Sequence, residues 1–277
     1  MPMLFGTAGK PISCQEKSSI EAVECVKNLG LDAMELEFVH GCKMKPENAA
    51  EVGRKGEEFK IKLSAHASYY LNLISQKPEI VSKSIKEIIT TGKVLTAAKA
   101  ERLVFHSGFY LELSKEAAYA EIKKKFQKII EEFKSEGITS VLAPELTGKP
   151  TQFGSLEELY SLSEELGYEN LRPTIDFAHY HARENGKIKG KEDYLKLFEY
   201  VEKKTGKKGL QTLHCHMSSV HFTEKGERNH LTMAHQAPPF KPLAEALKEF
   251  NCGGTIISES PNIEQDAIYM KKTYENL

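Results

Sequence analysis

The stretch Thr174-Ile175-Asp176-Phe177-Ala178-His179 holds a short β-branched and apolar run that ends in an acid, with a histidine three residues later. A short apolar run bounded by polar residues is typical of a buried strand. Several other predicted strands also end in histidine, glutamate or aspartate, and amphipathic segments separate them. This recurrence predicts an α/β fold whose strands return to one common mouth.

Eight strand and helix units alternate along the 277 residues. The predicted strands are 4–7, 33–38, 60–66, 103–106, 140–145, 174–176, 210–216 and 255–259. The predicted helices are 16–29, 46–59, 78–98, 115–135, 155–166, 191–204, 242–250 and 263–274. This number of units in this length matches a (β/α)8 TIM barrel. Because no linker or composition step divides the chain, we predict a single domain over residues 1–277.

An open, doubly wound sheet is the alternative fold. Such sheets usually carry a glycine-rich first turn that binds phosphate. The first turn here, Gly6-Thr7-Ala8-Gly9-Lys10, has neither GxGxxG nor GxxxxGK[ST] spacing. The barrel is therefore favoured.

Composition and charge limit the classes of function. Hydrophobic residues make up 40% and charged residues 28% of the chain, and no apolar run approaches the roughly 20 residues of a membrane span. The segment 1–6 lacks the basic and apolar parts of a signal peptide, so we expect a cytoplasmic protein without a membrane partner. A net charge of −1 does not by itself predict a surface that binds long stretches of nucleic acid.

Five cysteines, an odd number without CxxC spacing, indicate neither a disulfide framework nor a thiolate zinc site. They are Cys14, Cys25, Cys42, Cys215 and Cys252. We interpret them as structural or incidental residues.

Six consecutive predicted strands, from the third to the eighth, end in ionisable side chains. These are His66, His106, Glu145, Asp176, His216 and Glu259. With one residue of slack at each boundary, six such strand ends in a row arise by chance about once in two hundred sequences. Since the carboxyl ends of barrel strands converge on one mouth, we predict that these residues form a site.

Imidazole and carboxylate ligands without cysteine suit Zn²⁺, Mn²⁺ or similar divalent ions. His179 lies three residues past Asp176, at the start of the predicted following loop. His214 and His216 are two apart on a strand and share a face, so His214 is either a further ligand, a residue that supports one, or a core residue. More than four candidate ligands indicate more than one ion, because one zinc needs only three protein groups and a water.

These residues resemble motifs of the endonuclease IV group of apurinic/apyrimidinic endonucleases, within the xylose isomerase-like barrels, over most of the chain. The similar segments are Ser64-Ala65-His66-Ala67-Ser68-Tyr69-Tyr70-Leu71-Asn72-Leu73, His106-Ser107-Gly108, Glu145-Leu146-Thr147, Asp176-Phe177-Ala178-His179, His216-Met217-Ser218-Ser219, Gly226-Glu227-Arg228-Asn229-His230 and Glu259. In that family three zinc ions cleave the phosphodiester 5′ to an abasic site. The resemblance implies a zinc-dependent deoxyribonuclease of base excision repair with DNA containing abasic sites as its partner, and we expect a monomer.

The resemblance also implies a role for each ligand at the first two ions. His66 and His106 would hold one ion, with Glu145 as a bridge to the second. The second would be completed by Asp176, His216 and Glu259. We expect Glu145 and Glu259 to be the catalytic carboxylates.

We expect two or three ions in all, and His179 and His230 would hold the third. The family's remaining ligand there is an aspartate two residues before the second histidine, and this chain has Arg228 at that place, with Glu227 beside it. Tyr69 is predicted to contact substrate or a ligand, although a packed tyrosine fits its position equally well.

The loop after the second strand is a further departure from the family. Polar and basic residues contact DNA there in the family, whereas this chain reads Val39-His40-Gly41-Cys42-Lys43-Met44.

A sugar isomerase or epimerase on the same barrel is the alternative function. Such sites use glutamate, aspartate, histidine and glutamate from strands five to eight around one metal, a set that this chain supplies as Glu145, Asp176, His216 and Glu259. The other four histidines are not needed as ligands by a one-metal isomerase. A metal-binding barrel that binds nucleic acid or a partner without turnover is a third possibility, which Arg228 keeps open.

Overall fold

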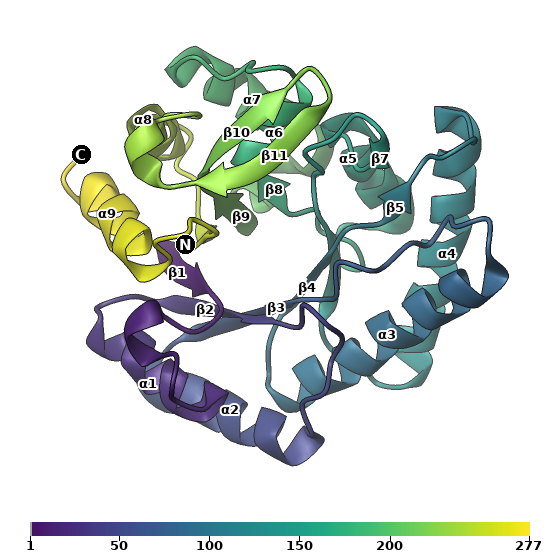
Figure 1. Ribbon diagram of the computed structural model, residues 1–277, viewed down its shortest axis with the longest axis horizontal. Coiled ribbons are helices and arrows are strands. Elements are labelled where there is room, and N and C mark those ends of the chain that lie inside the picture. The colour runs from purple at the N-terminus through teal and green to yellow at the C-terminus, as the bar shows by residue number, and fades with distance from the viewer. Residues whose placement is uncertain (1) are drawn as a thin grey trace.

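Eight parallel strands wind into a barrel with the helices outside it in the computed structural model, which describes residues 2–277 (Figure 1). The strand order in the sheet is β6-β4-β3-β2-β1-β12-β9-β8. Parallel bridges Leu142↔Leu171 and Glu145↔Thr174 join the chain segment that leads into β8 to β6 and its C-terminal flank. The sheet therefore closes on itself, and the predicted TIM barrel is confirmed.

The barrel strands are β1 (Met3–Ala8), β2 (Ala33–Glu37), β3 (Lys62–His66), β4 (Arg102–Phe105), β6 (Val141–Pro144), β8 (Ile175–Asp176), β9 (Leu213–Met217) and β12 (Gly254–Ser258). The helices are α1 (Ser19–Asn28), α2 (Pro46–Phe59), α3 (Pro78–Ala97), α4 (Lys115–Ser135), α5 (Leu156–Leu166), α6 (Phe177–Arg183), α7 (Lys191–Leu210), α8 (Phe240–Glu249) and α9 (Glu264–Glu275). Short elements complete the chain: η1 (Ile12–Cys14), β5 (Gly108–Phe109), β7 (Gln152–Phe153), β10 (Ser219–Thr223), β11 (Gly226–Leu231) and η2 (Met233–His235).

The helices begin where the sequence supplies caps. Ser18 and Ser155 each accept a hydrogen bond from the backbone three residues later and form capping boxes at α1 and α5. Pro46 occupies the first turn of α2, where its missing N–H is tolerated. Between the helices and the strands lies one large hydrophobic cluster, and all residues of β4 and β9 are buried.

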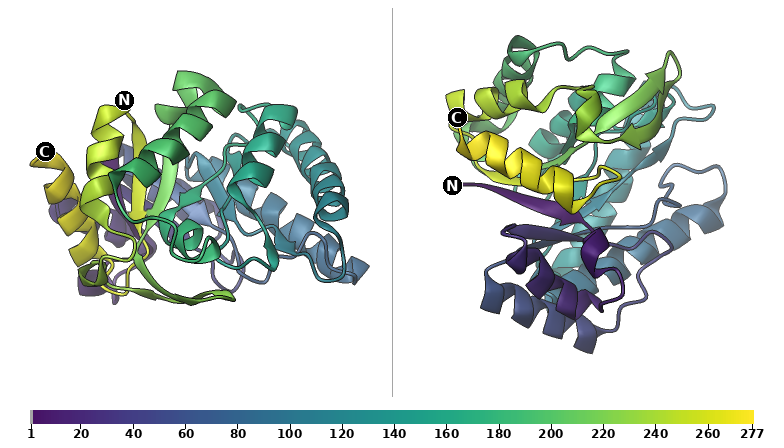
Figure 2. Two further views of the ribbon diagram at one scale, coloured as in Figure 1. Left: turned by 90° about the horizontal axis from the view of Figure 1, so that it is seen from above. Right: turned by 60° about the vertical axis from the view of Figure 1, so that its left-hand side comes forward.

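Two elements near the mouth differ from the prediction. The predicted loop at His179 is wrong, because the helix α6 begins directly after Asp176, whose Oδ1 accepts a hydrogen bond from the His179 backbone N–H at 2.6 Å. One aspartate therefore ends a strand and caps a helix. The antiparallel hairpin β10–β11 was not predicted, and it packs on α6 through Ala178, Ala182 and Val220. It lies at the end of the barrel toward which β1 points (Figure 2).

The expectation for the cysteines needs one correction. Cys14 and Cys25 form a disulfide between η1 and α1, with their Cα atoms 6.7 Å apart. The link is local, which spacing in the sequence did not reveal, and the other three cysteines are free. Within residues 2–277, no helix is long and apolar enough to cross a membrane.

Candidate metal centre

The C-terminal ends of the barrel strands bring the predicted side chains together. We define the rim group as His66, His106, Glu145, Asp176, His216 and Glu259. We define the hairpin group as His179, Glu227 and His230. Within the overlapping sets His66–His106–Glu145, Glu145–Asp176–His216–Glu259 and Asp176–His179–His230, ligand atoms lie within 4.8 Å of one another. The side chains are thus close enough to share bound cations.

Glu145 lies at the centre of the rim group and is 1% exposed. Its Oε2 is 3.0 Å from His66 Nε2 and 2.6 Å from His106 Nε2. Its Oε1 is 2.7 Å from His216 Nδ1. The two oxygens of one carboxylate therefore face different histidines, as a carboxylate that bridges two ions requires.

Three histidines of these two groups have Nδ1 at a backbone carbonyl. The N···O distances are 2.7 Å at His66, 2.8 Å at His179 and 3.1 Å at His230. Since a carbonyl only accepts, each Nδ1 carries a proton and donates it. In the neutral ring, Nε2 then presents its lone pair, and this is how a carbonyl partner orients a metal-binding histidine.

The hairpin group joins α6 to β11. His179 Nε2 and His230 Nε2 lie 3.4 Å apart, and the Glu227 carboxylate is 3.2 Å from the first and 3.4 Å from the second. Two imidazole lone pairs that face each other beside a carboxylate need a cation or protons between them. Two histidines and one carboxylate form a common zinc ligand set.

A β-bulge explains how Glu227 reaches this group. Asn229 and Glu227 pair with adjacent residues of β10, so Arg228 is an extra residue without a partner on β10. Arg228 and Asn229 are exposed, whereas Glu227 and His230 are partly buried. The bulge thus brings Glu227, three residues before His230, into the group, whereas Arg228, at the place of the family's aspartate, is exposed.

Gly148 leaves the space that Glu227 occupies. A Cβ atom at this position would lie 2.6 Å from Glu227 Oε2 and 3.0 Å from His179 Cδ2. The backbone N–H of Glu227 donates to the Gly148 carbonyl at 2.9 Å. Nothing in the sequence pattern marks this glycine, because its contacts come from the hairpin.

Burial and neighbouring charges shift the pKa values of Asp176 and Glu259, two acids of the rim group, in opposite directions. Burial raises the pKa of Asp176 to about 7, and the nearby Glu259 and Glu145 add to this effect. Burial also opposes ionisation of Glu259, but His216 overcomes it and lowers the pKa of Glu259 to about 2. Among residues 2–277, Asp176 Oδ2 is buried without a hydrogen-bond partner. A buried, unpartnered carboxylate oxygen beside imidazoles fits a divalent cation.

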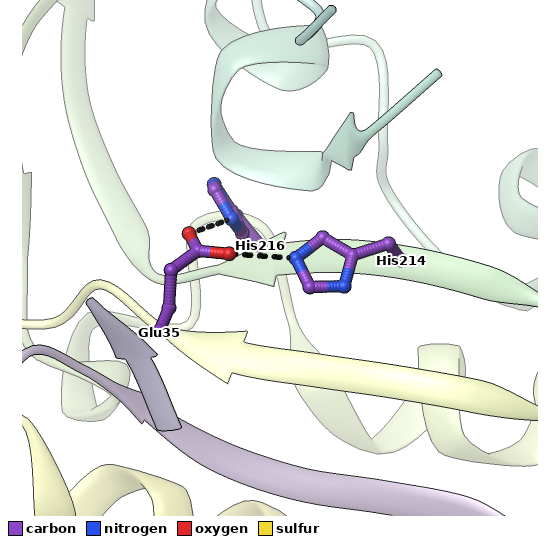
Figure 3. A group of neighbouring side chains, drawn as sticks. All are labelled: Glu35, His214 and His216. Carbon is purple, nitrogen blue, oxygen red and sulfur yellow. Dashed lines mark hydrogen bonds and ion pairs between the residues drawn. The ribbon is translucent and has the colours of Figure 1, made fainter. Parts of the chain in front are cut away.

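His214 does not join the rim group. Its Nε2 lies 2.8 Å from Glu35 Oε2, and His216 Nε2 lies 2.7 Å from Glu35 Oε1 (Figure 3). Glu35 was not among the predicted site residues. The alternation of strand 33–38 does place it on the same face as Glu37, but its partners come from the distant strand β9 and could not be inferred.

Tyr69 is 51% exposed in the loop that follows β3 and His66. Its hydroxyl donates to the hydroxyl of Tyr70 at 2.6 Å, and the two ring centroids are 4.1 Å apart. Tyr69 therefore packs against a neighbouring ring while half of it stays exposed, and its contact with substrate stays a prediction.

The family model described as a xylose isomerase-like TIM barrel matches residues 23–273. The chain belongs to this family. An uncharacterized protein of Methanocaldococcus jannaschii is 41% identical over 275 residues, which cover 99% of this chain and 98% of that protein. A probable endonuclease 4 of Persephonella marina is 28% identical over 166 residues, which cover 60% of this chain and 58% of that protein.

Solved structures share the fold of this xylose isomerase-like barrel. Endonuclease IV from Thermus thermophilus has a TM-score of 0.76 at 18% identity, with 99% of this chain and 98% of that chain covered. A D-tagatose 3-epimerase-like protein has a TM-score of 0.72 at 19% identity, with 100% and 96% covered. At these identities, the likeness establishes the fold alone, and the function must be argued from the site.

Proposed function

We propose that this protein is a metal-dependent phosphodiester hydrolase that cleaves DNA 5′ to abasic sites, with two or three Zn²⁺ ions, or Mn²⁺, held by the rim and hairpin groups. The hairpin group carries the proposal. A one-ion sugar epimerase has no need for His179, Glu227 and His230, yet their ligand atoms lie 3.2–3.4 Å apart beside the rim group. Relatives named probable endonuclease 4 support the same assignment.

Divalent ions in such a cluster lower the pKa of water and neutralise charge on a phosphodiester and its leaving oxygen. The residues of this chain position and balance those ions. Glu145 joins His66 and His106 to His216 through its two oxygens. Asp176 Oδ2 would be available to an ion, because it has no hydrogen bond while Oδ1 is held by the α6 backbone. The exposed Tyr69 is proposed to contact the DNA.

The first experiment is a nicking assay. The zinc- or manganese-loaded protein is incubated with a duplex that contains one abasic site, beside the same duplex without it. We expect a single nick 5′ to the abasic site, and its absence with both metals would refute the proposal.

Glu259→Ala tests the proposed catalytic carboxylate. Glu259 Oε1 lies 3.1 Å from His216 Nδ1, so the variant should lose one ligand and all measurable nicking while the circular dichroism spectrum is kept. Retained cleavage would remove Glu259 from the proposed site.

A sugar epimerase is the second candidate, because Glu145, Asp176, His216 and Glu259 by themselves form a set within 4.8 Å and an epimerase-like protein shares the fold. Metal content separates the two functions. A content near three ions per chain favours the nuclease, whereas a content near one, together with epimerisation of a ketose, favours the epimerase.

A further inference from the structure

His216 differs from the three histidines whose Nδ1 meets a backbone carbonyl. It faces the rim group with Nδ1, which is 2.7 Å from Glu145 Oε1 and 3.1 Å from Glu259 Oε1. Its Nε2 meets a carboxylate instead of a carbonyl, since Glu35 Oε1 is 2.7 Å away (Figure 3). A carboxylate next to Nε2 favours a proton on that nitrogen more strongly than a neutral carbonyl does, because the carboxylate carries a negative charge.

Glu35 reaches His216 across the interior of the barrel. It lies on β2, which is separated from β9 by β1 and β12 in the sheet. The side chains of Glu35 and His216 are both 0% exposed, so bulk solvent does not compete for their contact. Only a side chain that spans the barrel can make this connection.

Glu35 is itself held in place by two further donors. Ser64 Oγ donates to Oε2 at 2.6 Å, and His214 Nε2 lies 2.8 Å from the same oxygen. With Nε2 protonated on both histidines, Oε2 accepts from the Ser64 hydroxyl and the His214 ring, while Oε1 forms an ion pair with His216. These contacts also give the two histidines of β9 separate roles: His216 faces the cluster, and His214 supports the carboxylate behind it.

We propose that Glu35 is a positioning residue that fixes the ring of His216 and holds the proton on Nε2, so that Nδ1 is presented to a metal ion of the rim group. The proposal rests on the proposed function only in taking His216 as a metal ligand. Partners of this kind behind a metal-binding histidine typically change metal affinity by about 10- to 100-fold.

A separate ion held by Glu35, His214 and His216 is the competing arrangement, since their ligand atoms also lie within 4.8 Å. Such an ion would need the Nε2 lone pair of His216. A neutral His216 ring would then carry its proton on Nδ1 and could not bind an ion of the rim group. The position of this proton therefore separates the two arrangements.

The test combines ¹⁵N-histidine NMR with zinc titration against a chromophoric chelator, in the full-length protein. The variants are Glu35→Gln, which keeps the shape, and Glu35→Ala. Glu264→Gln is the matched control, because Glu264 is also a buried carboxylate but accepts from the backbone of Ile12 and Ser13, away from the histidines. Circular dichroism checks the fold of each variant.

We expect His216 to carry a proton on Nε2 in both the metal-free and the zinc-loaded protein. Glu35→Ala should make that proton exchange rapidly with water. It should also weaken the binding of one zinc ion by about 10- to 100-fold. Glu35→Gln should have a smaller effect in the same direction, and Glu264→Gln should have none.

Three outcomes would overturn the proposal. Unchanged zinc affinity and unchanged His216 signals in both folded Glu35 variants would show that Glu35 has no influence on the ligand. A His216 Nε2 that loses its proton on zinc binding would assign an ion to the competing arrangement. A wild-type protein that binds no zinc would defeat this proposal together with the nuclease, whereas zinc binding through His216 without DNA nicking would defeat the nuclease alone.

Discussion

The rim group and the hairpin group use the same ligand types but are held in different ways. The rim ligands follow parallel strands whose neighbours fix them on both sides, as β12 is fixed between β1 and β9. The hairpin ligands come from α6 and from a two-stranded ribbon with a bulge at Arg228. One half of the cluster is therefore placed by the barrel and the other half by the register of one hairpin.

The carboxylates at the centre of the two groups differ in exposure. The side chain of Glu145 is 1% exposed, whereas that of Glu227 is 20% exposed. A partly open site exchanges its contents with solvent more easily than a closed one. We expect ions of the rim group to be retained longer during dialysis against a chelator than the ion of the hairpin group.

Replacement of Glu145 by glutamine should have the largest effect. The amide cannot bridge ions as a carboxylate does, and His66, His106 and His216 would lose their shared anion. Since bound ions supply several kcal/mol of transition-state stabilisation, we expect nicking to fall by at least about a thousandfold. Elemental analysis should show the loss of rim ions, and an unchanged metal content would contradict the bridging role.

Acid should weaken metal binding by both groups, but over different ranges of pH. Burial opposes charge on His66, yet Glu145 raises its pKa to about 10, and Glu227 likewise raises the pKa of His230 to about 9. Both rings are protonated at neutral pH without metal, so each zinc must displace a proton and its affinity rises about tenfold per pH unit and proton. His230 should stop contributing to this rise near pH 9 and His66 near pH 10.

Metal-buffered titrations from about pH 6 to 10 measure this difference, and calorimetry in buffers of different ionisation enthalpy counts the protons released. An affinity that is constant between about pH 6 and 8 would contradict the protonated state of the metal-free rings.

Glu227→Ala should break only the hairpin group. We expect the loss of one ion per chain and about a hundredfold slower nicking, because the rim ligands are untouched. Adding Arg228→Asp restores the aspartate of the resembled family at its usual spacing. It should not rescue the ion, since residue 228 is exposed on the bulge. Rescue by this second change would show that the bulge does not set the direction of the side chains.

Gly148→Ala should have the smallest effect. The added methyl group would meet Glu227 Oε2 at 2.6 Å, so the carboxylate must shift while its chemistry is kept. We expect about tenfold weaker binding of the hairpin ion and normal rim ions. Gly190→Ala is a matched control, because no atom lies within 4 Å of an added Cβ there; equal effects at both positions would argue against a specific role of Gly148.

The site residues at the strand ends could be predicted because the C-terminal ends of all barrel strands lie at the same end of the barrel. Helices 46–59 and 115–135 were predicted with the bounds that the structure gives, and other elements differ by a few residues. The predictions failed where a residue depends on structure, local or distant, that its own sequence pattern does not mark. Asp176 caps an unexpected helix, Glu227 depends on a bulge, and Glu35 depends on a strand 179 residues away.

The last barrel strand, β12, lies between the first strand and β9. Glu259 follows β12 directly, and its backbone N–H donates to the carbonyl of Met217 at the end of β9. A ribosome-bound chain that has not yet released this strand has a gap in the sheet and lacks one proposed ligand. The complete set of proposed ligands therefore comes together only after the whole barrel has been synthesised.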